Sequence, residues 1–144
     1  PGGFLGKETY DKYILPYEKK YIDFCQSNGV PVMYHNCGEV MNLVDSYKEL
    51  GTKIVDPFSP PPLGDADLSK AIEMIDDDYC VVGGVDQVNV IQKGTLDDVK
   101  RATESTAKAG KRSRRFILQN ADLLEYGTPE GNVYQYVKTG IENG

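Results

Sequence analysis

The feature that most constrains the fold is a pattern that occurs four times: a short apolar run, a polar loop and then a helical pattern. The chain has 144 residues, and its four apolar cores lie at 32–34, 53–55, 80–82 and 116–118. The helical patterns that follow them lie near 40–50, 68–75, 96–109 and 129–141. Short, mostly apolar strands separated by helices are typical of a parallel sheet covered by helices. The sequence therefore predicts an α/β fold in which four parallel strands alternate with helices.

A leading helical pattern precedes the first of these strand–helix units. Apolar or aromatic side chains recur in it every three or four residues, which predicts an amphipathic helix over residues 7–28. The predicted apolar face consists of Tyr10, Ile14, Tyr17, Tyr21, Phe24 and Cys25. Pro16 predicts a kink within this helix, and Gly29 predicts its end.

Four strand–helix units amount to half of a (βα)8 (TIM-type) barrel, whose full length is typically about 250 residues. We expect residues 1–144 to form a single domain or fragment that corresponds to such a half. A half-barrel on its own exposes two sheet edges. The sequence therefore leaves two possibilities: a homodimer that pairs these edges, or a longer protein that includes the remaining units.

Composition narrows the class of partner and the compartment. Apolar residues make up 40% of the chain and charged residues 26%, which is the balance of a globular domain. The formal net charge of −6 disfavours nucleic-acid binding, which relies on clustered Lys and Arg. The sequence contains neither an apolar stretch of the roughly 20 residues that span a membrane nor a recognisable signal peptide. Three cysteines, an odd number, indicate reduced thiols and a cytoplasmic location.

The loops that follow the strands of a parallel α/β sheet share one rim, and this rim usually carries the chemistry. His35, the only histidine of the chain, and Cys37 end the first apolar run. Their spacing of two residues predicts that both point to the same side. An imidazole and a thiolate are ligands of zinc rather than of magnesium or calcium. The alternative is a core thiol beside a loop histidine.

Polar residues also follow the other strands. Asp56 and Asp86 end the second and third strands, where they could orient a substrate or act as general acid or base, and we predict a catalytic role for both. The alternative is that each caps a turn. Tyr34, Asn36 and Asn120 lie at the same rim and are predicted to contact the substrate.

The order of several short motifs resembles that of a known family. The chain contains, in this order, YDKYILPYEKKYID, GVPVMYHNCG, LGTKIVD, VVGGVD, GTLDDVK, RFIL and TPEGNVYQYV. This order and spacing resemble the C-terminal half of the uroporphyrinogen decarboxylase superfamily, which includes zinc- and corrinoid-dependent methyltransferases. The resemblance implies a (βα)8 barrel with its active site on the rim described above.

The resemblance also implies a zinc site. The methyltransferase branch uses a His-x-Cys motif, which His35 and Cys37 match, and a further cysteine at a position where this chain has Asp122. An Asp carboxylate can ligate zinc through oxygen, so Asp122 is implied as the third ligand. The alternative is that Asp122 is a polar loop residue or caps the turn that follows it.

The function implied by the resemblance is zinc-assisted methyl transfer. The methyl group would pass between a small-molecule donor or a thiol acceptor and a methyl-corrinoid that is carried by a separate protein. One alternative is uroporphyrinogen decarboxylation, which in this family requires no metal and holds an acidic tetrapyrrole with basic and polar groups; the rim residues named above are mainly acidic or neutral. The other alternative is an inactive half-barrel fragment.

Overall fold

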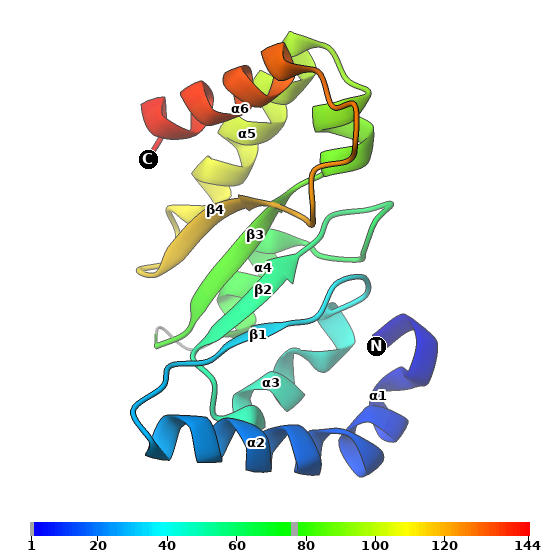
Figure 1. The fold of residues 1–144 in the computed structure, drawn as a ribbon, viewed down its shortest axis with the longest axis vertical. Helices are drawn as coiled ribbons and strands as arrows, with labels where there is room; N and C mark the ends of the chain where they lie inside the picture. The colour runs from blue at the N-terminus through cyan, green and yellow to red at the C-terminus, as the bar shows by residue number, and fades with distance from the viewer. Residues whose placement is uncertain (1, 76–77) are drawn as a thin grey trace.

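The structure is a computed structural model that describes residues 2–75 and 78–144. Its centre is a parallel sheet with the strand order β1-β2-β3-β4 (Figure 1). The strands are β1 (Met33–His35), β2 (Ile54–Phe58), β3 (Cys80–Val85) and β4 (Phe116–Asn120). Each strand overlaps one of the four predicted apolar cores, so the predicted alternation of parallel strands and helices is confirmed.

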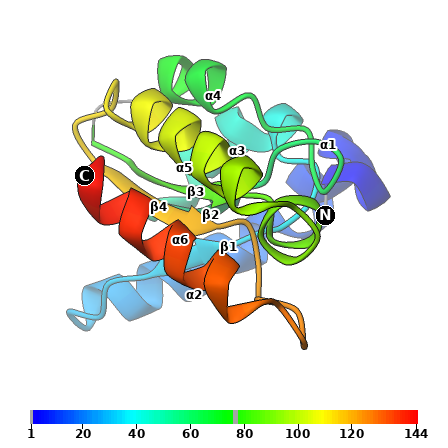
Figure 2. The ribbon, with the colours of Figure 1, turned by 90° about the horizontal axis from the view of Figure 1, so that it is seen from above.

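Helices connect the strands and cover one face of the sheet. The α-helices are α1 (Gly2–Tyr13), α2 (Leu15–Ser27), α3 (Val44–Leu50), α4 (Leu68–Met74), α5 (Leu96–Gly110) and α6 (Glu130–Glu142). Two further short elements are the 3₁₀-helix η1 (Met41–Leu43) and the π-helix η2 (Gln87–Gln92), and the sequence predicted no helix at η2. Figure 2 shows α3, α4 and α5 on one side of the sheet, with α2 and α6 at its flanks. No helix in the described part of the chain combines the length and apolar character required to cross a membrane.

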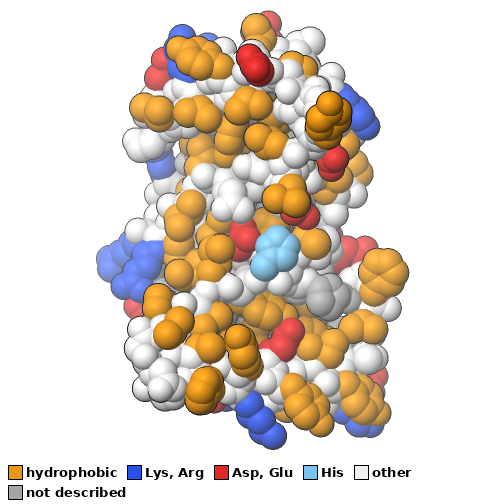
Figure 3. Space-filling model, viewed as in Figure 1, with side chains coloured by type: hydrophobic (Ala, Val, Ile, Leu, Met, Phe, Trp, Pro, Cys, Tyr) orange, Lys and Arg blue, Asp and Glu red, His pale blue; other side chains and the backbone are white. Residues whose placement is uncertain are grey.

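The core lies between the sheet and its helices. Val55 and Val81 are partners in the parallel register, and both are buried against the helix layer, where Tyr47 and Leu50 of α3 are fully buried. Burial of a large apolar side chain contributes about 1.5–3 kcal/mol. Successive strand residues point to opposite faces, so His35 and its register partner point to the face that no described helix covers. That open face is turned to the viewer in Figures 1 and 3.

The leading segment differs from the single kinked helix that the sequence predicts. It forms two helices, α1 and α2, which meet at Ile14, and Pro16 occupies the first turn of α2. Proline is favoured there because the first helical N–H groups have no intrahelical acceptor. The sequence predicts one helix with a kink at Pro16, whereas the structure has two helices that are separated at Ile14, so the prediction of one continuous helix is wrong.

The predicted apolar face of this segment is only partly buried. Tyr10 is fully buried, whereas Tyr17, Tyr21 and Phe24 are each about two-thirds exposed. Helix α2 instead buries Leu15 and Ile22. Periodicity identifies an apolar stripe but not the element that covers it, and these three aromatic side chains have no cover in the described chain.

Candidate metal centre

Three residues predicted as metal ligands come together at the rim formed by the C-terminal ends of the strands. His35 ends β1, Cys37 lies in the following loop, and Asp122 follows β4. One ligand atom from each lies within 4.8 Å of the others. The predicted convergence of the three side chains is therefore present in the structure.

Asp122 reaches this position because the loop after β4 is held in place. The N–H of Ala121 donates to the carbonyl of Val85 at 2.8 Å, which continues the pairing with β3. The Oγ of Ser59 donates to the carbonyl of Ala121 at 3.3 Å, and the side-chain amide of Asn120 donates to the carbonyl of Asp122. Ala121 is fully buried, so the backbone beside Asp122 is fixed from both sides.

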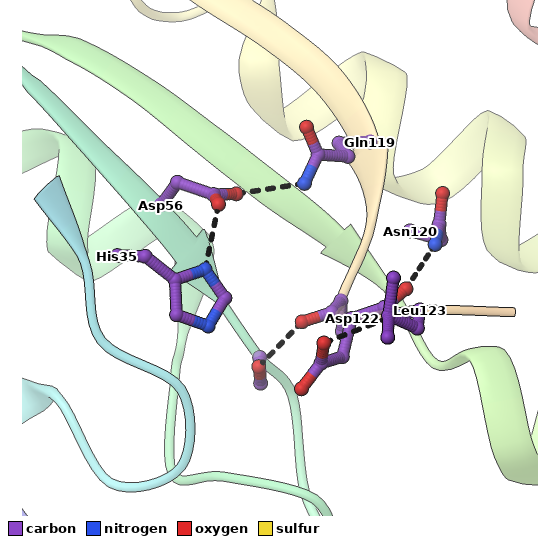
Figure 4. Close-up of polar contacts among 8 residues, drawn as sticks. His35, Asp56, Gln119, Asn120, Asp122 and Leu123 are labelled. Atoms are coloured by element: carbon purple, nitrogen blue, oxygen red, sulfur yellow. Dashed lines mark hydrogen bonds and ion pairs between the residues drawn. The ribbon is translucent and has the colours of Figure 1, made fainter. Parts of the chain in front are cut away.

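A buried carboxylate orients His35. Asp56 is 4% exposed and pairs with His35 in the register of β1 and β2. The Nδ1 atom of His35 lies 2.9 Å from Oδ2 of Asp56, and Nε2 of Gln119 donates to Oδ1 of Asp56 at 2.8 Å (Figure 4). A proton on Nδ1 leaves the Nε2 lone pair of His35 free, and in Figure 4 this second ring nitrogen lies on the side of Asp122. A carboxylate behind a histidine in this way is the usual support of a metal-bound imidazole.

The donor set fits a zinc ion. Imidazole nitrogen, thiolate sulfur and carboxylate oxygen are all zinc ligands, and ligand atoms around a tetrahedral ion lie roughly 3–4 Å apart. The observed upper limit of 4.8 Å is close to that spacing, and the side chains of His35 and Cys37 are exposed enough to adjust. One oxygen of Asp122 accepts the N–H of Leu123 at 2.8 Å, which leaves the other oxygen available. Three protein ligands leave a fourth position open, as in catalytic rather than structural zinc sites.

The three candidate ligands line a cavity of about 630 Å³. Asn36 and Gln87, which are 2% and 6% exposed, also line it. The amide nitrogen of Asn36 donates to the hydroxyl of Tyr47 at 2.5 Å, but the oxygens of both carboxamides have no hydrogen-bond partner among the described residues. Figure 3 shows His35, the only histidine, near the middle of the open face, with acidic and hydrophobic side chains around it.

The structure places Tyr34 away from this cavity. Its side chain points to the helix-covered side, where its hydroxyl donates to Oε2 of Glu18 at 2.7 Å and lies 3.0 Å from the hydroxyl of Tyr10. Burial, together with the nearby carboxylate, raises the pKa of Tyr34 above its ordinary value of 10.0. The geometry gives Tyr34 a packing role between β1 and the first two helices, and substrate contact by Tyr34 stays a prediction.

Asp86 is also occupied elsewhere. Its Oδ1 accepts the N–H groups of Val88 and Asn89, and its Oδ2 accepts the side-chain amide of Asn89. Asp86 thus caps η2, and it does not line the cavity of the three candidate ligands. A catalytic role for Asp86 stays a prediction, as does substrate contact by Asn120, which instead supports the Asp122 loop.

Sequence reasoning missed two glutamines at this site. Gln119 supports Asp56, and Gln87 lines the cavity. Side chains alternate along a strand, so Gln119, near the end of β4, faces the same side of the sheet as Ile117. This alternation is the feature of the sequence from which the position of Gln119 could have been predicted. For Gln87 the only signal is its position after the third strand, since the π-helix that buries it was not predictable.

Comparison with known proteins shows the family to which the chain belongs. The family model described as uroporphyrinogen decarboxylase (URO-D) matches residues 1–142. The chain therefore belongs to the uroporphyrinogen decarboxylase family, and its fold is part of a (βα)8 barrel.

Within that family, the chain is similar to methyltransferases. It is 29% identical over 106 residues to the "Methylcobamide:CoM methyltransferase MtbA" of Methanosarcina mazei, covering 74% of this chain and 30% of that protein. It is 25% identical over 140 residues to the "Methylated-thiol--coenzyme M methyltransferase" of the same organism, covering 93% and 33%. A solved structure described as a methyltransferase from Methanosarcina mazei matches with a TM-score of 0.77 at 17% identity, over 98% of this chain and 39% of that one. The chain thus spans about a third of the length of the curated relatives it matches.

Proposed function

We propose that the protein is a corrinoid-dependent methyltransferase with a zinc-assisted active site. The observation that carries this proposal is the convergence of His35, Cys37 and Asp122 at the rim, with Asp56 behind the histidine. The names of the methyltransferase relatives support it. The methyl group would pass between a small-molecule donor or a thiol acceptor and a corrinoid carried by a partner protein.

Each residue of the site has a definite task in this proposal. His35, Cys37 and Asp122 hold the ion, and Asp56 keeps the proton of the imidazole on Nδ1 so that Nε2 remains a ligand. When bound, zinc would lower the pKa of a substrate thiol or polarise an ether oxygen. The cavity beside the three ligands positions the substrate, since alignment of the reacting atoms accounts for much of the barrier reduction in such transfers.

Decarboxylation of a tetrapyrrole is the weaker alternative. Uroporphyrinogen carries many carboxylates, which a binding site must pair with cations or hydrogen-bond donors. None of the described residues that line the cavity is Lys or Arg, and two of them, Glu39 and Asp122, are acidic. This lining favours methyl transfer over the binding of a polyanion.

The test measures zinc per chain in the full-length protein by mass spectrometry after gel filtration under reducing conditions. We expect one zinc per chain, lost in Cys37→Ala and Asp122→Asn together with methyl transfer to or from a corrinoid protein. Cys25→Ala and Asp97→Asn are the matched controls, because they remove a thiol and a carboxylate outside the cluster. A protein that holds no zinc and whose methyl transfer survives Cys37→Ala would contradict the proposal, and turnover of uroporphyrinogen would favour the alternative.

A further inference from the structure

The loop that follows β2 touches both of the loops that carry Cys37 and Asp122. It consists of residues 59–66, with the sequence SPPPLGDA, and it lies between the loops after β1 and β4 at the rim of the sheet (Figure 1). Ser59 and Leu63 also line the cavity of the three candidate ligands. We call residues 59–66 the spanning loop.

One end of the spanning loop holds the chain that follows Cys37. Oδ1 of Asp65 accepts the N–H groups of residues 40–41, at 2.7 and 3.1 Å. Hydrogen bonds to a carboxylate are stronger than those between neutral groups. Gly64 lies so close to the Cys37 loop that a Cβ at this position would meet the carbonyl oxygen of Gly38. The spanning loop therefore limits the movement of the Cys37 loop.

The other end of the spanning loop holds the residue before Asp122. Oγ of Ser59, which is 2% exposed, donates to the carbonyl of Ala121 at 3.3 Å. The chain just before Ser59 packs closely on β3, because a Cβ at Gly84 would lie 3.0 Å from the carbonyl carbon of Phe58. A glycine permits this close approach of two backbones, and the contact places Ser59 within reach of the loop after β4.

The segment between these two ends is held by its own hydrogen bonds. The N–H groups of residues 63–64 both donate to the carbonyl of Pro60 at 3.1 Å, and the N–H of Ala66 donates to the carbonyl of Ser59 at 3.0 Å. Three consecutive prolines fix the φ angles of residues 60–62. The length of the segment is therefore fixed, so a displacement at one end is passed to the other.

We propose that the spanning loop is a spacer that sets the distance between Cys37 and Asp122, with Asp65 and Ser59 as its positioning residues. The inference deepens the proposed function and rests on it, because it concerns the ligands of the same site. His35 belongs to β1 itself, whereas Cys37 and Asp122 lie beyond the ends of β1 and β4, so contacts outside the sheet must fix their separation. A site that is ordered before binding holds its ligand more tightly.

The first test measures this separation in metal-free, full-length protein. Asp122→Cys places a second thiol beside Cys37, because the ligand atoms of the two positions lie within 4.8 Å of each other. The effective concentration of the two thiols is measured by equilibration with a glutathione redox buffer, and the disulfide is identified by peptide mass spectrometry. We expect Asp65→Ala and Ser59→Ala each to lower it about 3- to 10-fold, as the loss of one or two hydrogen bonds allows. Asp65→Asn keeps an oxygen acceptor and should retain most of it.

A double variant distinguishes a spacer from two independent anchors. In a spacer, release of either end breaks the link, so Ser59→Ala should add less than about twofold to the loss already caused by Asp65→Ala. Independent anchors would give losses that multiply. Thr95→Ala is the matched control, because it removes a capping bond of α5 away from the site and should leave the effective concentration unchanged.

The second test relates the spacing to the metal. Zinc affinity is measured by chelator competition in protein that retains Asp122, and cobalt(II) is substituted so that its thiolate charge-transfer band reports ligation by Cys37. We expect zinc affinity to fall in Asp65→Ala and Ser59→Ala in parallel with the effective concentration, and to be retained in Thr95→Ala.

The outcomes separate the inference from the proposed function. The inference is overturned by any of four results: no disulfide between positions 37 and 122, an unchanged effective concentration or zinc affinity in Asp65→Ala, losses that multiply in the double variant, or an equal loss in Thr95→Ala. A wild type that binds no zinc overturns the proposed function instead, and the thiol measurement then decides the inference without metal.

Discussion

Replacing Asp56 by Asn is expected to weaken zinc binding about tenfold without unfolding the protein. The side chain keeps its shape, but its oxygen loses the charge that holds the Nδ1–H of His35 at 2.9 Å. The contact with Gln119, at 2.8 Å, can be kept if the glutamine amide turns over, because both partners then carry one donor and one acceptor.

The magnitude follows from the burial of the pair. Asp56 is 4% exposed, so water does not replace the lost interaction. A hydrogen bond to a charged group contributes about 1.5–3 kcal/mol and a neutral one about 1 kcal/mol, which leaves a loss of about 0.5–2 kcal/mol. Changing the partner behind a metal-bound histidine typically costs 10- to 100-fold in metal affinity, or about 1.4–2.7 kcal/mol. The two ranges overlap near a factor of ten.

The assay is a competition titration with a chromophoric zinc chelator, with circular dichroism to confirm folding. Asp97→Asn, on the exposed side of α5, is the control and should bind zinc like the wild type. Cys37→Ala should abolish binding in the same assay. If Asp56→Asn binds zinc within threefold of the wild type while Cys37→Ala does not bind, Asp56 does not orient a metal ligand and the reasoning fails.

Two stability predictions follow from packing and capping. A Cβ at Gly110 would lie 2.1 Å from Cδ1 of Phe116, so Gly110→Ala should lower the free energy of unfolding by about 1–3 kcal/mol in a urea titration. Gly131→Ala, whose Cβ would lie 3.8 Å from the nearest atom, should cause no loss, and equal effects of the two changes would contradict the packing. Thr95→Ala should cost about 1 kcal/mol. Hydrogen bonds from the side chain and backbone of Thr95 lower the pKa of Asp98 below its ordinary 3.8 in the folded protein. The stabilisation that the Asp98 carboxylate contributes through these bonds is therefore fully present above the ordinary pKa. It is lost as the pH falls through the lowered pKa. A Thr95→Ala effect that stays constant from pH 6 to pH 2 would refute this linkage.

Strand positions and parallel pairing could be predicted because they depend on local pattern. The runs at 80–82 and 116–118 are apolar, β-branched or aromatic, and are bounded by helical segments, so each had one plausible structure. The prediction that their loops share a rim followed from the topology of parallel sheets. That rule is also what placed Asp122 near His35 despite a separation of many residues in the sequence.

Other features depend on neighbours that periodicity does not reveal. The aromatic residues Tyr17, Tyr21 and Phe24 repeat as a helix face should, yet α2 turns Leu15 and Ile22 inward. The roles of individual carboxylates could not be predicted from the sequence either. Both Asp56 and Asp86 end strands, but Asp56 meets a histidine across the register whereas Asp86 meets the N-terminus of η2. No pattern in the sequence distinguishes these two environments.

The strand order of the sheet also has a consequence for how the chain folds during synthesis. Every strand pairs only with its neighbours in the chain, and partners in the register lie roughly 20–35 residues apart, so each pairing closes a short loop at small entropic cost. At about 5–20 residues per second, a ribosome releases each strand–helix unit seconds after the one before it. We therefore expect the sheet to grow in order from β1 to β4, each new strand docking on the edge left by its predecessor. At each stage up to β4, the exposed edge of the growing sheet is the strand that was made last. The next strand to be synthesised is the one that pairs with this edge.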